Sequence, residues 1–230
     1  MGSQRLPGKV LADLGGKSML ARVVERLIDT KLVDLVMVAT TSQPADDAIV
    51  AHARQLGIMS FRGDTDDVLG RYLGAARASR AEVIVRVTAD CPLLDPGVVD
   101  RVVGVLARDV DYASNTQIRT YPRGLDVEAL HRDTLERIGR LATTPATREH
   151  VTSFVTEHPN DFRIAKVIAE KDDSDLRWTV DTPEDLALVR TLNGAGVWRD
   201  YRELVAFVRG RRDLAMSNAH VVQKHWTTHA

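Results

Sequence analysis

A loop at the start of the chain has the residue types that bind phosphate groups. It is the stretch Gly2-Ser-Gln-Arg-Leu-Pro-Gly-Lys9. Its glycines let the backbone approach an anion closely, while Arg5 and Lys9 add two positive charges that can grip a polyphosphate. A frayed basic end of the chain is the plainer interpretation of the same residues. The loop differs from the lysine loop of ordinary P-loop proteins.

Two carboxylates occupy positions where open α/β sheets place their ligands. Asp90 follows the apolar strand predicted at 82–87, and Asp181 stands between a strand predicted at 176–180 and a helix. Each could instead be a turn residue, although Thr182 already provides the helix cap beside Asp181. Magnesium bound to a triphosphate takes only one or two protein carboxylates. The pair therefore predicts a magnesium–polyphosphate site, provided that the fold brings the two together.

Several neighbouring residues have structural explanations. Asp95 precedes a proline and an apolar helical stripe, so we predict that it caps that helix. The acidic residues Asp64, Asp66 and Asp67 are typical of a solvated helix start. Cys91 could be a nucleophile, but local sequence supplies no histidine to activate it and an adjacent carboxylate raises a thiol pKa. We interpret it as a small packed side chain.

The elements that must position these residues alternate along the first half of the chain. Apolar residues at helical spacing predict a helix over 18–30, and the continuous apolar run over 35–41 predicts a buried strand. The alternation continues with helices at 45–56 and 67–79, strands at 58–61 and 82–87, and a helix from Asp95. Apolar strands separated by helices indicate a covered parallel sheet.

The second half has a different pattern. Alternating polar and apolar residues over 125–130 predict a half-exposed strand within a lobe at about 116–160. Other predicted strands are 111–115, 162–169 and 176–180, and the predicted helices are 134–141, 147–157, 184–192 and 200–208. We expect one domain over 1–210 and a poorly ordered tail over 211–230, which has little apolar pattern.

Composition excludes some functions. The formal net charge is −1, so no uniform field favours nucleic acid or an anionic membrane surface. No apolar run is long enough to span a bilayer or to act as a signal peptide, and a single cysteine excludes an internal disulfide. These features predict a cytoplasmic protein.

Taken in order, the motifs resemble the cytidylyltransferases that activate sialic acid, pseudaminic acid and Kdo, most closely the spore coat polysaccharide branch. The resemblance runs from Gly2 to about Leu192 and is carried by Ser3-Gln-Arg-Leu-Pro-Gly-Lys9, Phe61-Arg-Gly-Asp-Thr-Asp-Asp-Val-Leu-Gly-Arg-Tyr72, Thr88-Ala-Asp-Cys-Pro-Leu-Leu-Asp95, Pro122-Arg-Gly-Leu-Asp-Val-Glu128, Arg148-Glu-His-Val-Thr152 and Trp178-Thr-Val-Asp-Thr-Pro-Glu-Asp185. It implies an α/β, Rossmann-like fold of the nucleotide-diphospho-sugar transferase kind, with a mostly parallel sheet flanked by helices and a small β-containing lobe.

The resemblance also implies roles for particular residues. Arg5 and Lys9 would bind the triphosphate, Asp90 and Asp181 would hold Mg²⁺, and Arg71 would lie in a loop facing the nucleotide. Lys9, Asp90 and Asp181 would be the catalytic residues, and Asp90 would also contact the nucleotide. The acceptor side, or alternatively the lobe of a homodimer, would include Arg123, Asp126, Glu128, Arg148 and His150.

The implied reaction is transfer of CMP from CTP to a sugar or sugar acid, with release of pyrophosphate, in polysaccharide or glycoconjugate biosynthesis. One alternative is a glycosyltransferase of related fold, for which Asp109-Val-Asp111 is the only metal-motif candidate. Another is a truncated paralogue that binds nucleotide without catalysis.

The chain departs from the family pattern at its start. Family members have an apolar strand ahead of the Arg-Leu-Pro-Gly-Lys loop, whereas this sequence begins inside that loop. We therefore expect the first sheet strand to be missing and two neighbouring strand edges to be exposed.

Overall fold

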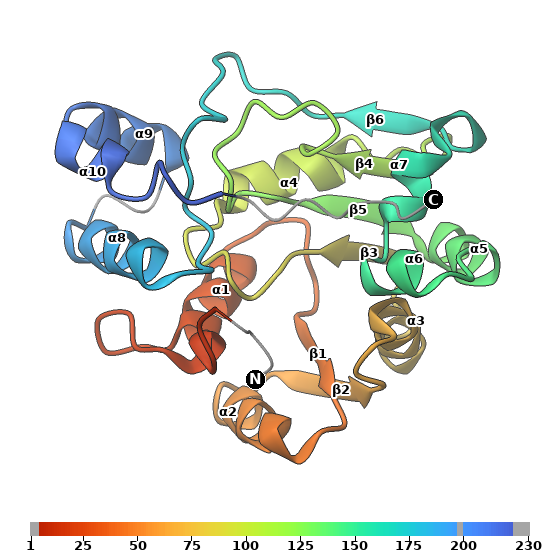
Figure 1. Ribbon diagram of the computed structural model, residues 1–230. Helices are drawn as coiled ribbons and strands as arrows, with labels where there is room; N and C mark the ends of the chain where they lie inside the picture. Colours follow the sequence, from red (N-terminus) through yellow and green to blue (C-terminus); the bar gives the residue numbers. More distant parts are fainter. Residues whose placement is uncertain (1–4, 197–199, 223–230) are drawn as a thin grey trace.

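The computed structural model describes residues 5–196 and 200–222 as helices and strands that alternate along the chain (Figure 1). The strands are β1 (Met37–Thr41), β2 (Met59–Gly63), β3 (Val83–Arg86), β4 (Tyr112–Ser114), β5 (Glu128–His131) and β6 (Ile164–Lys166). The α-helices are α1 (Met19–Ile28), α2 (Asp47–Gln55), α3 (Val68–Ser79), α4 (Pro96–Gly104), α5 (Arg132–Leu141), α6 (Pro145–Glu149), α7 (Ser153–Glu157), α8 (Pro183–Gly194), α9 (Tyr201–Arg209) and α10 (Arg212–Met216). Short 3₁₀ helices are η1 (Lys9–Leu11), η2 (Pro44–Asp46) and η3 (Pro159–Asp161).

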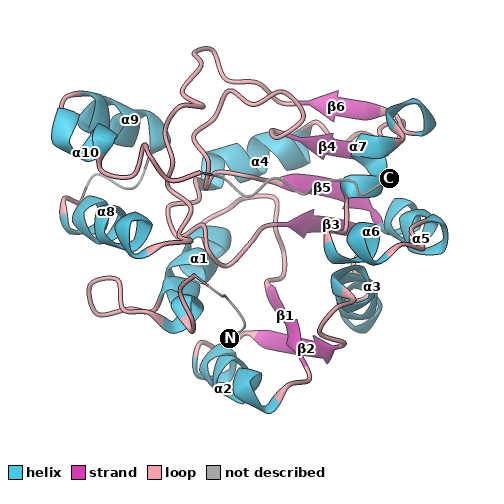
Figure 2. Cartoon of the chain, in the orientation of Figure 1, coloured by secondary structure: helices cyan, strands magenta, loops and turns pink. Residues whose placement is uncertain are grey.

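The strands form two sheets with helices around them (Figure 2). The larger sheet has the order β3-β5-β4-β6, in which β5 runs antiparallel to β3 and β4 while β4 and β6 are parallel. Three of its four strands thus share one direction, as predicted. The smaller sheet is the parallel pair β1-β2. Within the described residues, β1 and β3 each pair with a strand on one side only.

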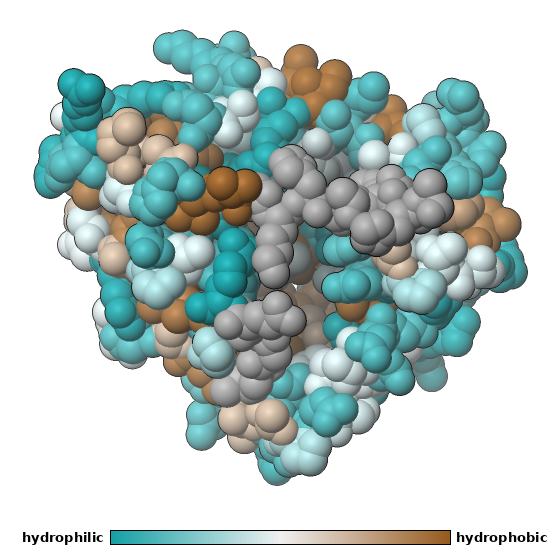
Figure 3. All heavy atoms as spheres, viewed as in Figure 1, coloured by the Kyte–Doolittle hydropathy of each residue, from teal (hydrophilic) through white to brown (hydrophobic). Residues whose placement is uncertain are grey.

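The main core lies between the larger sheet and the helices α1, α4, α8 and α9, with Trp178 and Val180 fully buried in it. A second core packs α3 and α5 against the β3 end of the sheet. Hydrophilic residues cover much of the face seen in Figure 3. None of the helices in the described ranges has the length and hydropathy needed to cross a bilayer.

Helix starts follow the predicted capping residues. The Asp95 carboxylate accepts a hydrogen bond from Val98 N and begins α4, and its second oxygen accepts from Tyr201 N. Thr182 caps α8 and forms a reciprocal capping box with Asp185. The prediction that Asp95 caps a helix is confirmed.

The prediction of a half-exposed strand at 125–130 is wrong. The observed strand β5 lies between β3 and β4, and Glu128, Ala129 and Leu130 are all buried. The alternation of polar and apolar residues predicted one solvent-exposed face. Glu128, however, is buried and hydrogen-bonded instead of facing solvent.

Other boundaries also differ. No described strand covers 176–180, where one isolated bridge joins Arg123 to Arg177. The helix predicted at 147–157 divides into α6 and α7 near Val151, whose φ is 52°. Within the predicted tail, 212–216 form α10, and Leu214 and Asn218 are buried, while 223–230 lie outside the described residues.

The loop that contains Gly124 approaches the segment before Asp181 closely, and a substitution at Gly124 tests this contact. Its φ is 105°, and an added Cβ would lie 2.6 Å from Thr179 N and 2.7 Å from Trp178 C. We expect Gly124→Ala to lower the free energy of unfolding in urea by more than about 2 kcal/mol. The control Gly57→Ala has a φ of 71° but meets nothing within 4 Å, so it should cost only about 1 kcal/mol. Equal losses in the two variants would contradict the close approach.

Candidate functional site

Lys9, Asp90 and Asp181 meet at one point, although they come from three distant segments. The ammonium Nζ of Lys9, at the start of η1, donates to Asp90 Oδ2 and to Asp181 Oδ1, each at 2.8 Å. It also donates to the backbone oxygen of Val180 at 2.7 Å. Their side chains are between 11% and 24% exposed, so the group is largely shielded but reachable. The sequence-based inference that the two carboxylates approach each other is confirmed.

Charge pairing affects the pKa values of Lys9 and Asp181 more than burial does. Burial lowers the pKa of Lys9, but Asp90 and Asp181 more than compensate, and the net effect is a raised pKa. Burial alone raises the pKa of Asp181, while the hydrogen bond from Lys9 and its charge bring that pKa below the usual value. Lys9 and Asp181 therefore both carry charge at neutral pH.

The other oxygen of Asp181 binds two arginines. Its Oδ2 lies 3.0 Å from a guanidinium nitrogen of Arg5 and 2.8 Å from one of Arg177. One carboxylate thus has three cationic partners. Two of these cations are shared with other carboxylates, because Lys9 also pairs with Asp90 and Arg177 also pairs with Asp185.

Backbone contacts hold the two acidic segments together. Val180 N donates to Asp90 O at 2.8 Å, which joins the loop after β3 to the segment before α8. Thr88 Oγ1 donates to Asp90 Oδ1 at 2.6 Å and orients that carboxylate. Gly8, with a φ of 71°, makes the turn that begins η1 and directs Lys9 toward them. The site thus lies at the carboxyl end of β3, as expected for an open α/β sheet.

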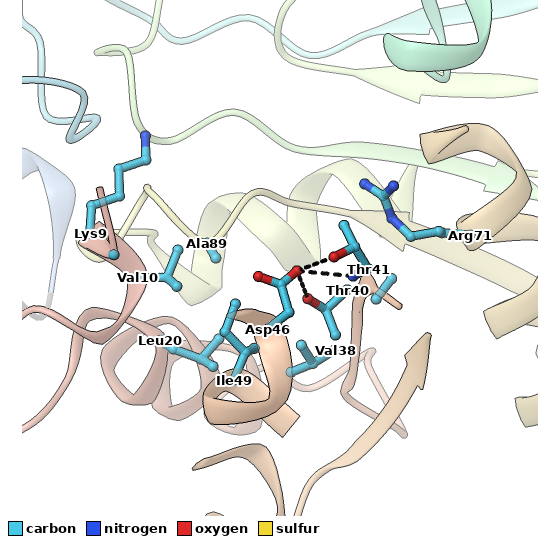
Figure 4. A pocket seen from close by; sticks show the side chains of 12 residues that line it. Lys9, Val10, Leu20, Val38, Thr40, Thr41, Asp46, Ile49, Arg71 and Ala89 are labelled. Carbon is cyan, nitrogen blue, oxygen red and sulfur yellow. Dashed lines mark hydrogen bonds between the residues drawn. The ribbon is translucent and has the colours of Figure 1, made fainter. Parts of the chain in front are cut away.

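A cavity of about 260 Å³ adjoins Lys9 (Figure 4). Figure 4 shows Lys9 and Arg71 on opposite sides of it, with Thr40, Thr41 and Asp46 between them. Asp46 Oδ2 accepts hydrogen bonds from both threonine hydroxyls and from Thr41 N. Sequence reasoning missed this trio. The available signal was a run of hydroxyl residues at the end of β1 followed by an acid at a helix start.

Arg71 lines this cavity from the first turn of α3, whereas the resemblance implied a loop position; its contact with a nucleotide stays a prediction. Its Nη1 donates to the backbone oxygens of Asp64 and Thr65, which fixes the loop between β2 and α3. Its Nε is buried, and no hydrogen-bond partner for it is found among the described residues. A buried donor without a partner is costly, so this atom is available to a ligand or a water molecule.

Of the five residues predicted for the acceptor side, two lie near the site. Arg123 forms the bridge to Arg177, exchanging backbone hydrogen bonds with Leu176 and Trp178. Asp126 pairs with Arg119, and its charge contributes to the raised pKa of Cys91, after burial and Asp90. Cys91 is buried, which agrees with its interpretation as a packed thiol.

The other three have partners away from Lys9. Glu128 is buried and binds Arg86, Tyr112 and Thr152. Arg148 pairs with Asp67 at 2.6 Å, and His150 ends α6. Their role in acceptor binding stays a prediction.

Proteins of similar sequence match most of the length of this chain. A family model described as cytidylyltransferase matches residues 1–212. An uncharacterized protein of Methanocaldococcus jannaschii is 34% identical over 98% of this chain and 93% of its own length. The spore coat polysaccharide biosynthesis protein SpsF of Bacillus subtilis is 33% identical over 84% of this chain and 82% of its own length.

Solved structures confirm the Rossmann-like α/β fold. A cytidylyltransferase from Leptospira borgpetersenii superposes with a TM-score of 0.90 at 31% identity, covering 99% of this chain and 95% of that one. A CMP:2-keto-3-deoxy-manno-octonic acid synthetase complexed with CTP superposes with a TM-score of 0.62 at 21% identity, covering 85% and 95%, and it supports the fold alone. With the family model matching from the basic loop to α10, the chain belongs to the cytidylyltransferase family.

Proposed function

We propose that this protein transfers CMP from CTP to an oxygen of a sugar or sugar acid, with pyrophosphate leaving. The observation that carries the proposal is the Lys9 ammonium held between Asp90 and Asp181. Membership of the cytidylyltransferase family supports the nucleotide. The acceptor class is supported by relatives named for spore coat polysaccharide biosynthesis and as 3-deoxy-manno-octulosonate cytidylyltransferases.

The two carboxylates fit a magnesium ion. Both accept hydrogen bonds from a single cation, the Lys9 ammonium, so they already face a common positive centre. In the part of the chain that the structure describes, no cluster of three or more such ligands occurs, but Mg²⁺ bound to a nucleotide needs only one or two carboxylates. When bound, Mg²⁺ would neutralise charge on the phosphate oxygens and polarise the phosphorus under attack.

Lys9 and Arg5 have the complementary role. An ammonium and a metal ion cannot occupy the same position between two carboxylates, so Lys9 would have to turn away from them when Mg²⁺ is bound. The triphosphate supplies a new anionic partner for it. Lys9 and Arg5 then stabilise charge on the departing pyrophosphate, and no residue of the protein becomes covalently attached.

The cavity beside Lys9 is our proposed place for the nucleoside part of CTP. The hydroxyls of Thr40 and Thr41 and the buried Nε of Arg71 supply polar contacts there, and Leu20 and Ile49 supply apolar ones. This division is typical of small-molecule sites. Arg123 then belongs to the acceptor side, because its backbone bridges to Arg177, which pairs with Asp181, and Asp126 of the same loop is assigned with it.

The resemblance to the sugar-acid cytidylyltransferases supports three further assignments. Arg148 and His150 belong either to the acceptor side or to a lobe, about 116–160, through which two copies form a homodimer. Glu128, which carries the same prediction, is buried and bound by Arg86, Tyr112 and Thr152, so it stabilises the fold instead. The protein acts in the cytoplasm. Its partners are CTP and the sugar substrate, with neither nucleic acid nor a membrane involved, in keeping with the balanced charge.

A glycosyltransferase is less well supported. Its candidate motif ends at Asp111, whose carboxylate pairs with Arg163 just before the amino end of β4. Because β3 and β4 run in the same direction, that motif lies at the sheet edge opposite to Asp90.

The decisive assay is pyrophosphate release from each of the four nucleoside triphosphates with Mg²⁺ and candidate sugar acids. We expect release with CTP and an acceptor only. Thermal stabilisation by CTP without pyrophosphate release would instead indicate a non-catalytic nucleotide-binding protein.

Asp181→Asn tests the metal role. It keeps the shape of the side chain but removes the charge that a cation needs, so we expect the rate of pyrophosphate release to fall by at least about 100-fold with the fold retained. The matched control is Asp172→Asn, because Asp172 is exposed and accepts a hydrogen bond only from Ser174 among the contacts described. A fully active Asp181→Asn enzyme would refute the assignment.

Lys9→Met tests the cation exchange. Without the ammonium, Asp90 and Asp181 repel each other, so the free energy of unfolding in EDTA should fall by about 1–2 kcal/mol, less than for a fully buried pair. Adding Mg²⁺ should raise the free energy of unfolding of the variant by more than it raises that of the wild type. Turnover with CTP should be lost in the variant. Lys17→Met is the control, because Lys17 pairs with Glu25 at an exposed position. No difference in Mg²⁺ response between Lys9→Met and wild type would contradict the exchange.

A further inference from the structure

A buried hydrogen-bonded chain of side chains leads from Asn218, which follows α10, to the carboxylate of Asp181. Asn218 Nδ2, after α10, donates to Asp185 Oδ1 at 2.8 Å. Arg177 Nε donates to the same oxygen at 2.9 Å, and its Nη2 donates to Asp185 Oδ2 at 3.1 Å. The same Nη2 donates to Asp181 Oδ2 at 2.8 Å.

The members of this chain are shielded from water. Asp185 is fully buried, Asn218 is 3% exposed and Arg177 is 7% exposed. A two-pronged guanidinium–carboxylate pair fixes the plane and the direction of the arginine far better than a single contact would. Asn218 adds a second anchor through its hydrogen bond to Arg177 O at 3.0 Å.

These contacts fix the orientation of the Asp181 carboxylate. With Oδ2 held by Arg177, Oδ1 is left facing Lys9 and, through it, Asp90. Asp185 also accepts hydrogen bonds from the backbone N–H groups of Asp181 and Thr182, at 2.9 and 3.1 Å. The same buried carboxylate thus holds both the backbone and the side-chain partner of Asp181.

We propose that Arg177, held by Asp185 and Asn218, is the positioning residue that directs Asp181 Oδ1 toward the metal. This inference rests on the proposed function, because it gives Arg177 its role through the cation bound by Asp90 and Asp181. Arg177 itself touches neither nucleotide nor metal in this assignment. Partners that orient a ligating carboxylate typically affect metal affinity by about 10- to 100-fold.

Arg177→Lys separates orientation from charge. It keeps the positive charge but cannot make the two-pronged contact with Asp185. We expect Mn²⁺, used as the probe in the presence of CTP and followed by electron paramagnetic resonance, to bind about 10- to 100-fold more weakly. The kcat should fall, while the KM for CTP, set mainly by Arg5 and Lys9, changes less.

Two further variants complete the test. Asn218→Ala removes one anchor and leaves the Arg177–Asp185 pair, so it should weaken Mn²⁺ binding in the same direction but by a smaller factor, and it decides the question if Arg177→Lys does not fold. Arg163→Lys is the matched control, because Arg163 makes a two-pronged pair with Asp111 at an exposed site and should leave Mn²⁺ binding unchanged.

The outcomes are distinguishable. If wild-type protein with CTP binds no Mn²⁺, the proposed function fails. If wild type binds it and a folded Arg177→Lys, or Asn218→Ala, binds it equally well, the positioning role is wrong while the proposed function stands. A crystal structure of the variant gives a readout independent of activity: Asp181 Oδ1 should leave its position 2.8 Å from Lys9 Nζ.

Discussion

The structure of this site depends on one cation shared by two carboxylates. Asp90 and Asp181 are separated by about two fifths of the chain. Both are partly withdrawn from water, and like charges repel more strongly in that environment than in water. The Lys9 ammonium compensates that repulsion, and Arg5 and Arg177 add positive charge on the other side of Asp181. The basic loop, the end of β3 and the start of α8 are consequently held as one unit.

That unit also has a rigid backbone. The hydrogen bond from Val180 N to Asp90 O joins the two acidic segments directly, and Asp185 fixes the turn between them by accepting from two backbone N–H groups. Electrostatic stabilisation of a reacting phosphate is effective only when the charged groups are held in place beforehand. The buried pair of Arg177 and Asp185 supplies such support from behind the site.

Acidic residues in the same motifs have different uses. Glu128 is the last residue of the motif that contains Arg123, yet its carboxylate is buried among Arg86, Tyr112 and Thr152, where it ties β3, β4 and the start of α7 together. Asp95 is the last residue of the motif that contains Asp90, but it caps α4 and anchors the start of α9. The position of a carboxylate within a motif does not show whether it is available to a ligand or stabilises the fold. The hydrogen-bonding partners of its oxygens show which of the two applies.

The sequence by itself determined the features that local physics controls. Apolar spacing predicted α1, apolar spacing and the caps Asp95 and Thr182 predicted α4 and α8, and the position of Asp90 after an apolar strand indicated the ligand-binding edge of the sheet. Only the tertiary structure decided that β5 lies in the middle of the sheet and that Asn218 reaches Asp185. Periodicity records which residues are apolar, but it does not identify the distant residue that a polar side chain meets. The contacts of Lys9 span 81 and 172 positions, and such pairings follow from how the helices and strands pack, which no local pattern encodes.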